Sequence, residues 1–226
     1  MLLLWDIDHT LVEMRGIGTE LFGRAFAEVT GVRMERQAAV DGMTDLVIFR
    51  ETAALHGIQA GPEETARFTA ALGRAHEDAV AEIQARGRAL PGAREALAAL
   101  DARGVRQTVV TGNVRGSARV KLSAFALDEP IVWDIGAYGD EAETRPELVR
   151  TALTRARAVV HTEDVTLIGD TPADMEGAAA HGVRALAVAT GRTGENALAA
   201  AGARYTLPDL RDTERLVRLL TGGCTS

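Results

Sequence analysis

The residues with the clearest chemical potential lie near the start of the chain, where Asp6 and Asp8 follow a short apolar run. The segment reads WDIDHTLV, so two carboxylates are separated by one residue at the point where the apolar run stops. Like charges at this spacing disfavour ionisation unless a cation intervenes. The pair therefore predicts either an acidic turn or a site where the carboxylates carry out chemistry.

Two later polar segments contain the other residue types that such a site needs. Thr111, Gly112 and Asn113 follow one apolar run, and Asp170 and Asp174 follow another in the stretch GDTPAD. Converging carboxylates favour a hard divalent cation, most plausibly Mg²⁺. A hydroxyl and backbone N–H groups at a turn into a helix suit a phosphate. Together they predict phosphoryl transfer, with one aspartate as nucleophile and another as acid and base.

The elements that must position these residues alternate between strand and helix. Apolar runs typical of buried parallel strands occur at Leu2–Ile7, Val105–Val110, Ile131–Ile135, Val165–Ile168 and Arg184–Ala189. Helical periodicity fills the intervals and the C-terminal part, at Ala93–Arg103, Ser117–Phe125, Pro146–Ala158, Ala173–His181, Glu195–Ala201 and Asp209–Leu220. Ligands of such sheets bind beyond the carboxyl ends of the strands, so we expect the three polar segments to meet at one edge.

The segment 14–89 departs from this alternation. It contains helical patterns and no convincing strand; the patterns are Thr19–Val29, Asp45–Leu55 and Pro62–Ala85. We therefore predict a doubly wound, mostly parallel α/β core formed by residues 1–13 and 90–226, with a small all-helical domain, 14–89, inserted after the first strand. Within the insert, Asp41–Asp45 either faces the site or only begins a helix with Thr44 as its N-cap.

Composition excludes several classes of protein. The chain has 226 residues and a net charge of −7 with no basic stripe, which argues against nucleic acid as a partner. Its single cysteine, Cys224, cannot form an internal disulfide or a zinc cluster. No apolar run is long enough for a membrane span, and the first residues do not resemble a signal segment. We expect a reducing, cytoplasmic location and no membrane partner.

At this point the chain resembles the haloacid dehalogenase superfamily, in its phosphoglycolate-phosphatase-like branch. Its motifs occur in order as DIDHT, VVTGN, a basic residue before proline in TRPEL, and GDTPAD. The helical insert lies between the first two motifs, where this branch has its α-helical cap. The resemblance implies a Rossmann-like core, Mg²⁺ as cofactor and a small phosphorylated metabolite as substrate.

The resemblance also implies roles for individual residues. Asp6 would attack phosphorus and form an aspartyl-phosphate, while Asp8 would protonate the leaving oxygen and then activate water. The phosphoryl group would be bound by Thr111, Gly112, Asn113 and Arg145. The Mg²⁺ ion would be held by Asp6, the backbone carbonyl of Asp8, and Asp170, with support from Asp174.

Two of these assignments have rivals. The third motif of the family usually provides a lysine, whereas this chain has Arg145 there, and its only lysine is Lys121. We favour Arg145, although Lys121 on the preceding helix could reach the site because helical side chains lean toward the N-terminus. For Asp174, capping of a helix that begins after Thr171 is an equal alternative to metal support.

The leading prediction is a Mg²⁺-dependent phosphatase acting on a small phosphomonoester. Asp8 argues against a dehalogenase, and the absence of lysine from the insert argues against a phosphonatase. A sugar phosphomutase of the same superfamily and a non-catalytic phosphate-binding regulatory protein are the alternatives. Neither the identity of the substrate nor the choice between monomer and homodimer follows from the sequence.

Overall fold

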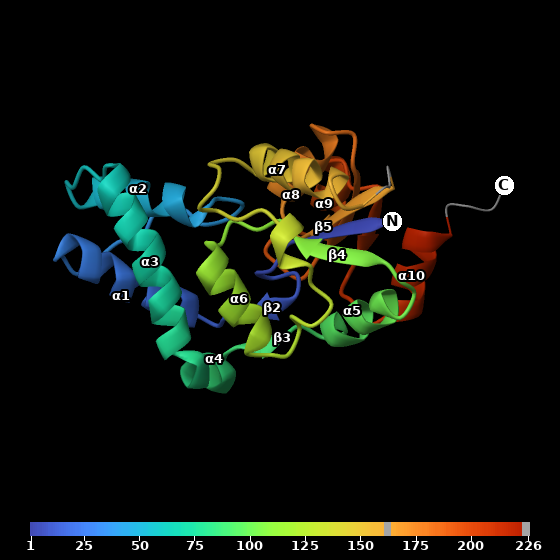
Figure 1. The fold of residues 1–226 in the computed structure, drawn as a ribbon, viewed down its shortest axis with the longest axis horizontal. Helices are drawn as coiled ribbons and strands as arrows, with labels where there is room; N and C mark the ends of the chain where they lie inside the picture. The colour runs from blue at the N-terminus through green and yellow to red at the C-terminus, as the bar shows by residue number, and fades with distance from the viewer. Residues whose placement is uncertain (161–163, 223–226) are drawn as a thin grey trace.

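A five-stranded parallel sheet forms the centre of the molecule (Figure 1). The computed structural model describes residues 1–160 and 164–222, so Cys224 lies outside the described residues. The strands run in the order β4-β1-β5-β6-β7 and span Leu2–Trp5 (β1), Arg106–Val109 (β4), Val165–Gly169 (β5), Arg184–Val188 (β6) and Tyr205–Leu207 (β7). The predicted α/β fold with a mostly parallel sheet is confirmed.

Helices cover both faces of this sheet because β1 is apolar on both sides. Leu3 and Trp5 pack on one face, and Leu2 and Leu4 pack on the other, as the alternation of side chains along a strand requires. The first face is covered by α5 (Ala93–Asp101), α6 (Arg115–Ser123) and α10 (Thr213–Thr221). The second is covered by α7 (Arg145–Arg157), α8 (Pro172–Ala179) and α9 (Glu195–Ala200).

One predicted strand is wrong, and one strand of the main sheet was missed, as was the two-residue pairing of Val12–Glu13 with Arg88–Ala89. Ile131–Ile135 ends in a short 3₁₀ helix, η1 (Trp133–Ile135), and its β-pairing with the edge strand β4 is limited to one isolated bridge between Gln107 and Ile131. An apolar run beside an edge strand can be buried without forming a ladder, so its composition alone wrongly predicted a strand. The missed strand, β7, is short and half-polar (YTL).

The inserted segment forms four helices, α1 (Ile17–Thr30), α2 (Asp45–Leu55), α3 (Pro62–Asp78) and α4 (Val80–Arg86). The first three of them enclose an aromatic core of their own. Phe68 packs with its ring centroid 4.2 Å from that of Phe49 and 4.8 Å from that of Phe22. A short antiparallel ribbon of β2 (Val12–Glu13) and β3 (Arg88–Ala89) joins both ends of this segment, which we call the cap. Its division from the core at residues 14 and 89 stays a prediction.

The cap meets the core through two close backbone approaches. Helix α3 packs on α6, and a Cβ added at Gly116 would lie 3.0 Å from the Cα of Gly73. Before α2, a Cβ on Gly112 would lie 2.3 Å from the carbonyl oxygen of Met43. The cap is therefore seated over the carboxyl ends of β1 and β4.

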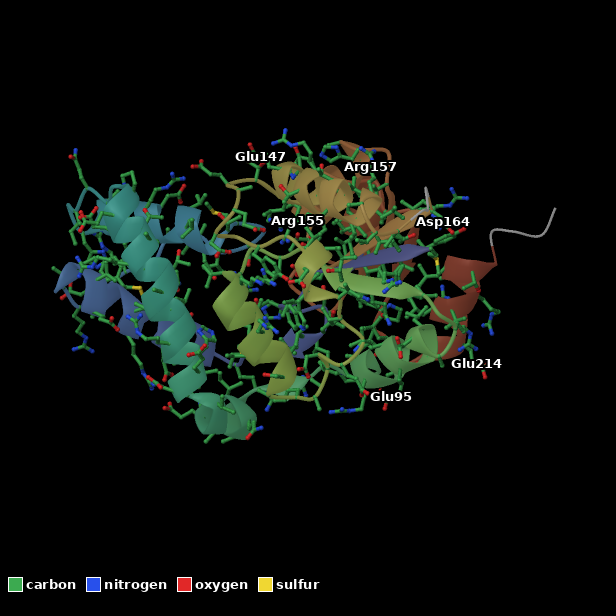
Figure 2. The ribbon with its side chains drawn as sticks, in the orientation of Figure 1. Glu95, Glu147, Arg155, Arg157, Asp164 and Glu214 are labelled. Carbon is green, nitrogen blue, oxygen red and sulfur yellow. The ribbon has the colours of Figure 1, made fainter. Side chains whose placement is uncertain are left out.

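The outer faces of the helices around the sheet carry exposed charged side chains, among them Glu95 on α5, Arg157 on α7 and Glu214 on α10 (Figure 2). Among the described residues, no helix combines the length and the apolar character that crossing a bilayer requires.

Candidate active site

Three carboxylates meet where neighbouring strands end. Asp6 directly follows β1, and its N–H donates to the carbonyl of Ile168 at 2.8 Å, so the pairing of β1 with β5 continues up to the site. Asp170 directly follows β5, and Asp174 lies in the first turn of α8. One carboxylate oxygen from each of the three lies within 4.8 Å of the others. The predicted convergence of the first and last motifs is thus present in the structure.

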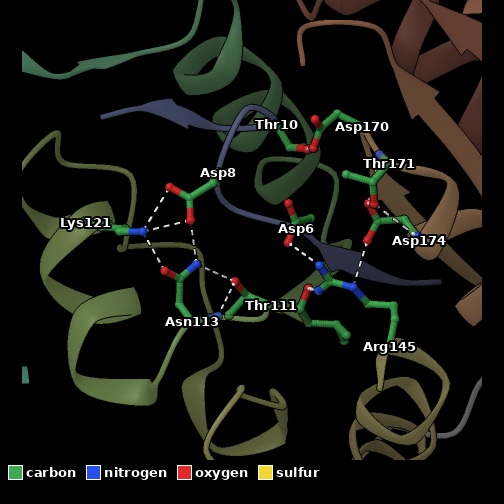
Figure 3. A network of polar contacts seen from close by, with 11 residues as sticks. Asp6, Asp8, Thr10, Thr111, Asn113, Lys121, Arg145, Asp170, Thr171 and Asp174 are labelled. Carbon is green, nitrogen blue, oxygen red and sulfur yellow. Dashed lines mark hydrogen bonds and ion pairs between the residues drawn. The ribbon is translucent and has the colours of Figure 1, made fainter. Parts of the chain in front are cut away.

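Arg145 lies between two of these acids (Figure 3). Its guanidinium nitrogen Nη2 is 3.2 Å from Asp6 Oδ1, and its Nε is 3.1 Å from Asp174 Oδ1. Its third nitrogen, Nη1, donates to the carbonyl of Val110 at 2.9 Å. Arg145 starts α7 directly before Pro146, a residue suited to the first turn of a helix. The side chain is only 5% exposed, so this is a buried ion pair at the centre of the site.

Crowding and burial make Asp6 and Asp170 hard to ionise. Burial raises the pKa of Asp6 well above its usual range; Arg145 opposes this rise, and the charges of Asp174 and Asp170 add to it. Burial, followed by repulsion from Asp174, raises the pKa of Asp170 to about 7. A divalent cation beside these oxygens would favour their charged forms. The electrostatics of the group therefore fit a cation.

Asp174 caps α8, which is one of its two predicted roles, and its role in supporting a metal stays a prediction. Its Oδ2 accepts hydrogen bonds from the backbone N–H and the hydroxyl of Thr171, at 3.1 and 2.6 Å, and so caps α8. Its Oδ1 is buried without a hydrogen bond, and the contact with Arg145 Nε is an ion pair that lacks hydrogen-bond geometry. A buried carboxylate oxygen left in this way beside Asp6 and Asp170 is chemically suited to Mg²⁺.

Asp8 belongs to a second cluster with its own cation. Lys121 Nζ lies 2.9 and 2.7 Å from the two carboxylate oxygens of Asp8 and 2.5 Å from Asn113 Oδ1. The side-chain amide of Asn113 also donates to Asp8 Oδ2 at 2.7 Å. Burial opposes ionisation of Asp8, yet the charge and hydrogen bonds of Lys121 lower its pKa below the usual value. Arg145 and Lys121 are therefore both in the site, each beside a different aspartate.

Thr111 lies between the two clusters (Figure 3). Its hydroxyl oxygen accepts hydrogen bonds from the backbone N–H and the side-chain amide of Asn113, at 3.2 and 2.7 Å. The Asn113 N–H is thus engaged with Thr111 here, while the hydroxyl hydrogen of Thr111 can turn toward a ligand. The next residue, Gly112, accepts a hydrogen bond from the N–H of Asp45 at 2.8 Å. The second motif therefore contacts Asp8 through Asn113 and the cap through Gly112.

The segment Asp41–Asp45 shows both of its predicted features. Thr44 is the N-cap of α2 and accepts a hydrogen bond from Val47 N–H at 3.4 Å. Asp45 faces the core, where Oδ2 accepts from Val114 N–H at 2.8 Å, and burial raises its pKa to about 6. This segment closes one side of the site.

Both clusters line one cavity of about 540 Å³ between cap and core. The core provides Asp6, Asp8, Thr111, Lys121, Arg145 and Asp170. The cap provides both apolar side chains, Phe22, Val40, Met43, Ile48 and Leu72, and polar ones, Thr19, Gln37, Asp41, Asp45 and His76. A small phosphorylated molecule would have its phosphate among the core residues and its remainder against the cap.

Two residues of the site did not stand out in the sequence. Thr10 donates its hydroxyl to Asp170 Oδ1 at 3.2 Å and so joins the first motif to the last. His76 of α3 lines the cavity and is only 2% exposed. Thr10 could have been found as the final position of DIDHT. His76 has the helical spacing of a core position and gives no signal of its own.

Comparison with known proteins agrees with this geometry. Over 197 residues, 85% of this chain and 80% of the relative, the sequence is 28% identical to a phosphoglycolate phosphatase of Rhodospirillum rubrum. The fold is similar to that of a Pseudomonas syringae hydrolase, with a TM-score of 0.68, 21% identity, and coverage of 96% of this chain and 97% of that one.

A second solved structure has the same fold. CbbY of Rhodobacter sphaeroides, in complex with phosphate, matches with a TM-score of 0.65 and 20% identity, over 93% of this chain and 95% of that one. The family model described as haloacid dehalogenase-like hydrolase matches residues 3–188, which include all four motifs. The chain therefore belongs to the haloacid dehalogenase-like hydrolase family.

Proposed function

We propose that this protein is a Mg²⁺-dependent phosphatase that hydrolyses a small phosphomonoester through an aspartyl-phosphate. The observation that carries the proposal is the meeting of Asp6, Asp170 and Asp174 within 4.8 Å of one another, beside Arg145, where Asp6 and Asp170 line the cavity between cap and core. The name of the Rhodospirillum rubrum relative supports a phosphatase. Mg²⁺ bound by these acids would neutralise the charge of the phosphoryl oxygens.

In the first step, a carboxylate oxygen of Asp6 forms a bond to phosphorus while the bond from phosphorus to the ester oxygen breaks. Asp8 gives its proton to the departing oxygen, so the product leaves as an alcohol. Arg145 and Thr111 stabilise the charge on the phosphoryl oxygens. In the second step, Asp8 takes a proton from water, which attacks phosphorus and releases inorganic phosphate and Asp6.

The two forms of Asp8 that these steps need have opposite electrostatic requirements. The Lys121 ion pair favours the carboxylate, which is the form that activates water. A bound phosphate dianion favours the protonated form, because like charges disfavour ionisation. The first step therefore requires the contact between Lys121 and Asp8 to loosen as substrate binds.

The proposal is tested by measuring phosphate release from a panel of phosphomonoesters with and without Mg²⁺. The wild type should release phosphate only with Mg²⁺, and acid-quenched protein should carry phosphate on Asp6 by mass spectrometry. Asp6→Asn should lose at least about 10³-fold in activity, since it removes the nucleophile. The matched control Asp134→Asn, at a 91% exposed carboxylate, should keep wild-type activity.

Three results would contradict the proposal. Full activity of Asp6→Asn would eliminate the aspartyl-phosphate. Interconversion of sugar phosphates without net phosphate release would identify a phosphomutase. Phosphate binding without turnover of any ester would support a regulatory protein.

A further inference from the structure

The cap side of the cavity provides no positively charged arginine or lysine side chain. The cap residues that line the cavity instead include Asp41, Asp45 and His76. A carboxylate on the leaving group would therefore have to find a cation of the core. Three cations of the core, Lys121, Arg145 and Arg192, line the cavity.

Each of these three cations already has partners. Lys121 contacts both oxygens of Asp8 and the side-chain oxygen of Asn113, which accounts for the three donors of an ammonium group. Arg145 contacts Asp6 and Asp174 and donates to the carbonyl of Val110. Arg192 is paired with Asp41 at 3.1 Å and its side chain is 77% exposed. An anionic leaving group would have to displace a partner of Lys121 or Arg145, or compete with solvent and with the carboxylate of Asp41 for the remaining N–H groups of Arg192.

His76 offers the opposite kind of group, an unused acceptor. Its Nδ1 lies 2.9 Å from the carbonyl oxygen of Leu72, so Nδ1 carries the hydrogen and Nε2 carries a lone pair. Among the described residues Nε2 has no hydrogen-bond partner, although the side chain is only 2% exposed. Burial, with the charge of Lys121, lowers the pKa of His76 to about 4, so the ring is neutral at neutral pH. A buried acceptor without a donor is costly unless a ligand supplies one.

We propose that the substrate is a phosphomonoester whose leaving group is uncharged and bears a hydroxyl, and that this hydroxyl donates a hydrogen bond to His76 Nε2. The proposal rests on the phosphatase function proposed above. The apolar cap side chains Leu72 and Phe22 would contact the carbon skeleton of the same group. His76 is then a specificity-determining residue for this reaction, and a carboxylate-bearing ester such as phosphoglycolate is a poorer substrate.

The wild type alone can test the substrate class. We would compare kcat/KM for glycerol 3-phosphate, n-propyl phosphate and phosphoglycolate, which differ in the hydroxyls and the charge of the leaving group. We expect glycerol 3-phosphate to exceed both others by about tenfold or more, the effect of one hydrogen bond to a buried acceptor. Equal or better turnover of n-propyl phosphate or phosphoglycolate would overturn the proposal.

Variants then test whether His76 is responsible. His76→Phe removes the acceptor at similar volume and should abolish the preference for glycerol 3-phosphate over n-propyl phosphate, while His76→Gln should restore part of it. The matched control is His56→Phe, because His56 also has Nδ1 near the carbonyl four residues earlier, at 2.8 Å, but its Nε2 accepts from Glu35 N–H. A preference that survives in His76→Phe would overturn the assignment of His76.

One further substrate separates this proposal from the function on which it rests. p-Nitrophenyl phosphate has a good leaving group with no hydroxyl. Its hydrolysis therefore does not depend on a hydrogen bond to His76. His76→Phe should thus lose much less activity toward p-nitrophenyl phosphate than toward glycerol 3-phosphate. If the wild type hydrolyses none of the four esters, the phosphatase function itself fails; if it hydrolyses p-nitrophenyl phosphate but shows no hydroxyl preference, only the substrate class fails.

Discussion

Asp6 and Asp8 are separated by one residue, yet their surroundings differ in almost every respect. Asp6 shares Arg145 with Asp174 in a fully buried group, and burial raises its pKa. Asp8 forms an ion pair with Lys121. The side chain of Asp8 is 34% exposed, and its pKa is lowered. The difference shows how neighbouring carboxylates can be given separate chemistry, because alternate residues beyond a strand point to different sets of partners.

The largest effect should come from Asp8→Asn, which removes the proposed acid–base group and leaves the proposed nucleophile in place. This variant keeps Asp6 but has no proton to donate, so alkyl phosphates should lose about 10²–10⁴-fold in kcat. p-Nitrophenyl phosphate should lose much less in aspartyl-phosphate formation, because its leaving group needs no proton. The measurement is a single-turnover burst of p-nitrophenolate. An equal loss in the burst and with alkyl esters would mean that Asp8 is not the acid.

Removing each cation in turn should affect folding stability unequally. Arg145→Met leaves two buried carboxylates without their shared partner and should cost about 3 kcal/mol in the free energy of unfolding. Lys121→Met should cost only about 1 kcal/mol, since solvent partly screens Asp8 and Asn113 still donates to it. Urea unfolding of both variants measures the difference. Equal losses would show that the two clusters are not electrostatically distinct.

The pH dependence of stability should reveal the acid group around Asp170. The pKa of Asp170 is about 7 in the folded protein, whereas an aspartate in an unfolded chain titrates near about 3.9. The folded state thus binds the extra proton between these values, and metal-free stability should fall by about 3 kcal/mol as pH rises from about 4 to about 7.

Mg²⁺ should reverse this loss, because it binds the ionised acids. The increase in Tm on adding Mg²⁺ should therefore be larger at pH about 8 than at pH about 5. Asp170→Asn should remove most of both effects, while Asp8→Asn should leave the Mg²⁺-dependent shift largely intact. A Mg²⁺ shift that is independent of pH would contradict the assignment of these acids.

The smallest expected effect belongs to Thr10, which orients Asp170. Thr10→Val keeps the shape of the side chain but removes its hydrogen bond, and should cost about 1 kcal/mol in stability. Activity should fall a few-fold, with half-saturation by Mg²⁺ shifted to higher concentration. Thr166→Val offers a comparison, because its buried hydroxyl has no hydrogen-bond partner among the described residues and lies on β5. An unchanged Mg²⁺ dependence in Thr10→Val would show that Asp170 is held by other contacts.

Much of this site could be predicted from sequence because strand alternation and strand ends are local signals. The apolar run before Asp6 and the run before Asp170 became the adjacent strands β1 and β5, so their acids had to meet. The polar segment at Thr111 was found for the same reason. The resemblance to the haloacid dehalogenase superfamily then implied a chemical role for each of these positions.

The remaining features depend on contacts between distant elements. Sequence alone could not divide Arg145 and Lys121 between two aspartates. Arg145 begins α7 and Lys121 lies in the last turn of α6, so the acid that each one reaches depends on how these helices pack on the sheet. His76 has the spacing of a core residue, and its free Nε2 is evident only when α3 is placed on the core. The run at Ile131–Ile135 misled because burial beside an edge strand does not require a ladder.

The contact between Gly73 and Gly116 has a consequence for the size of the substrate. It brings the backbones of α3 and α6 together without any side chain between them. His76 follows Gly73 by about one turn, and Lys121 follows Gly116 by slightly more, so rigid helices set the gap between cap acceptor and acid–base group. If the hydroxyl of the substrate binds His76 as proposed, the fixed separation between His76 and the ion pair of Asp8 with Lys121 limits the length of the leaving group.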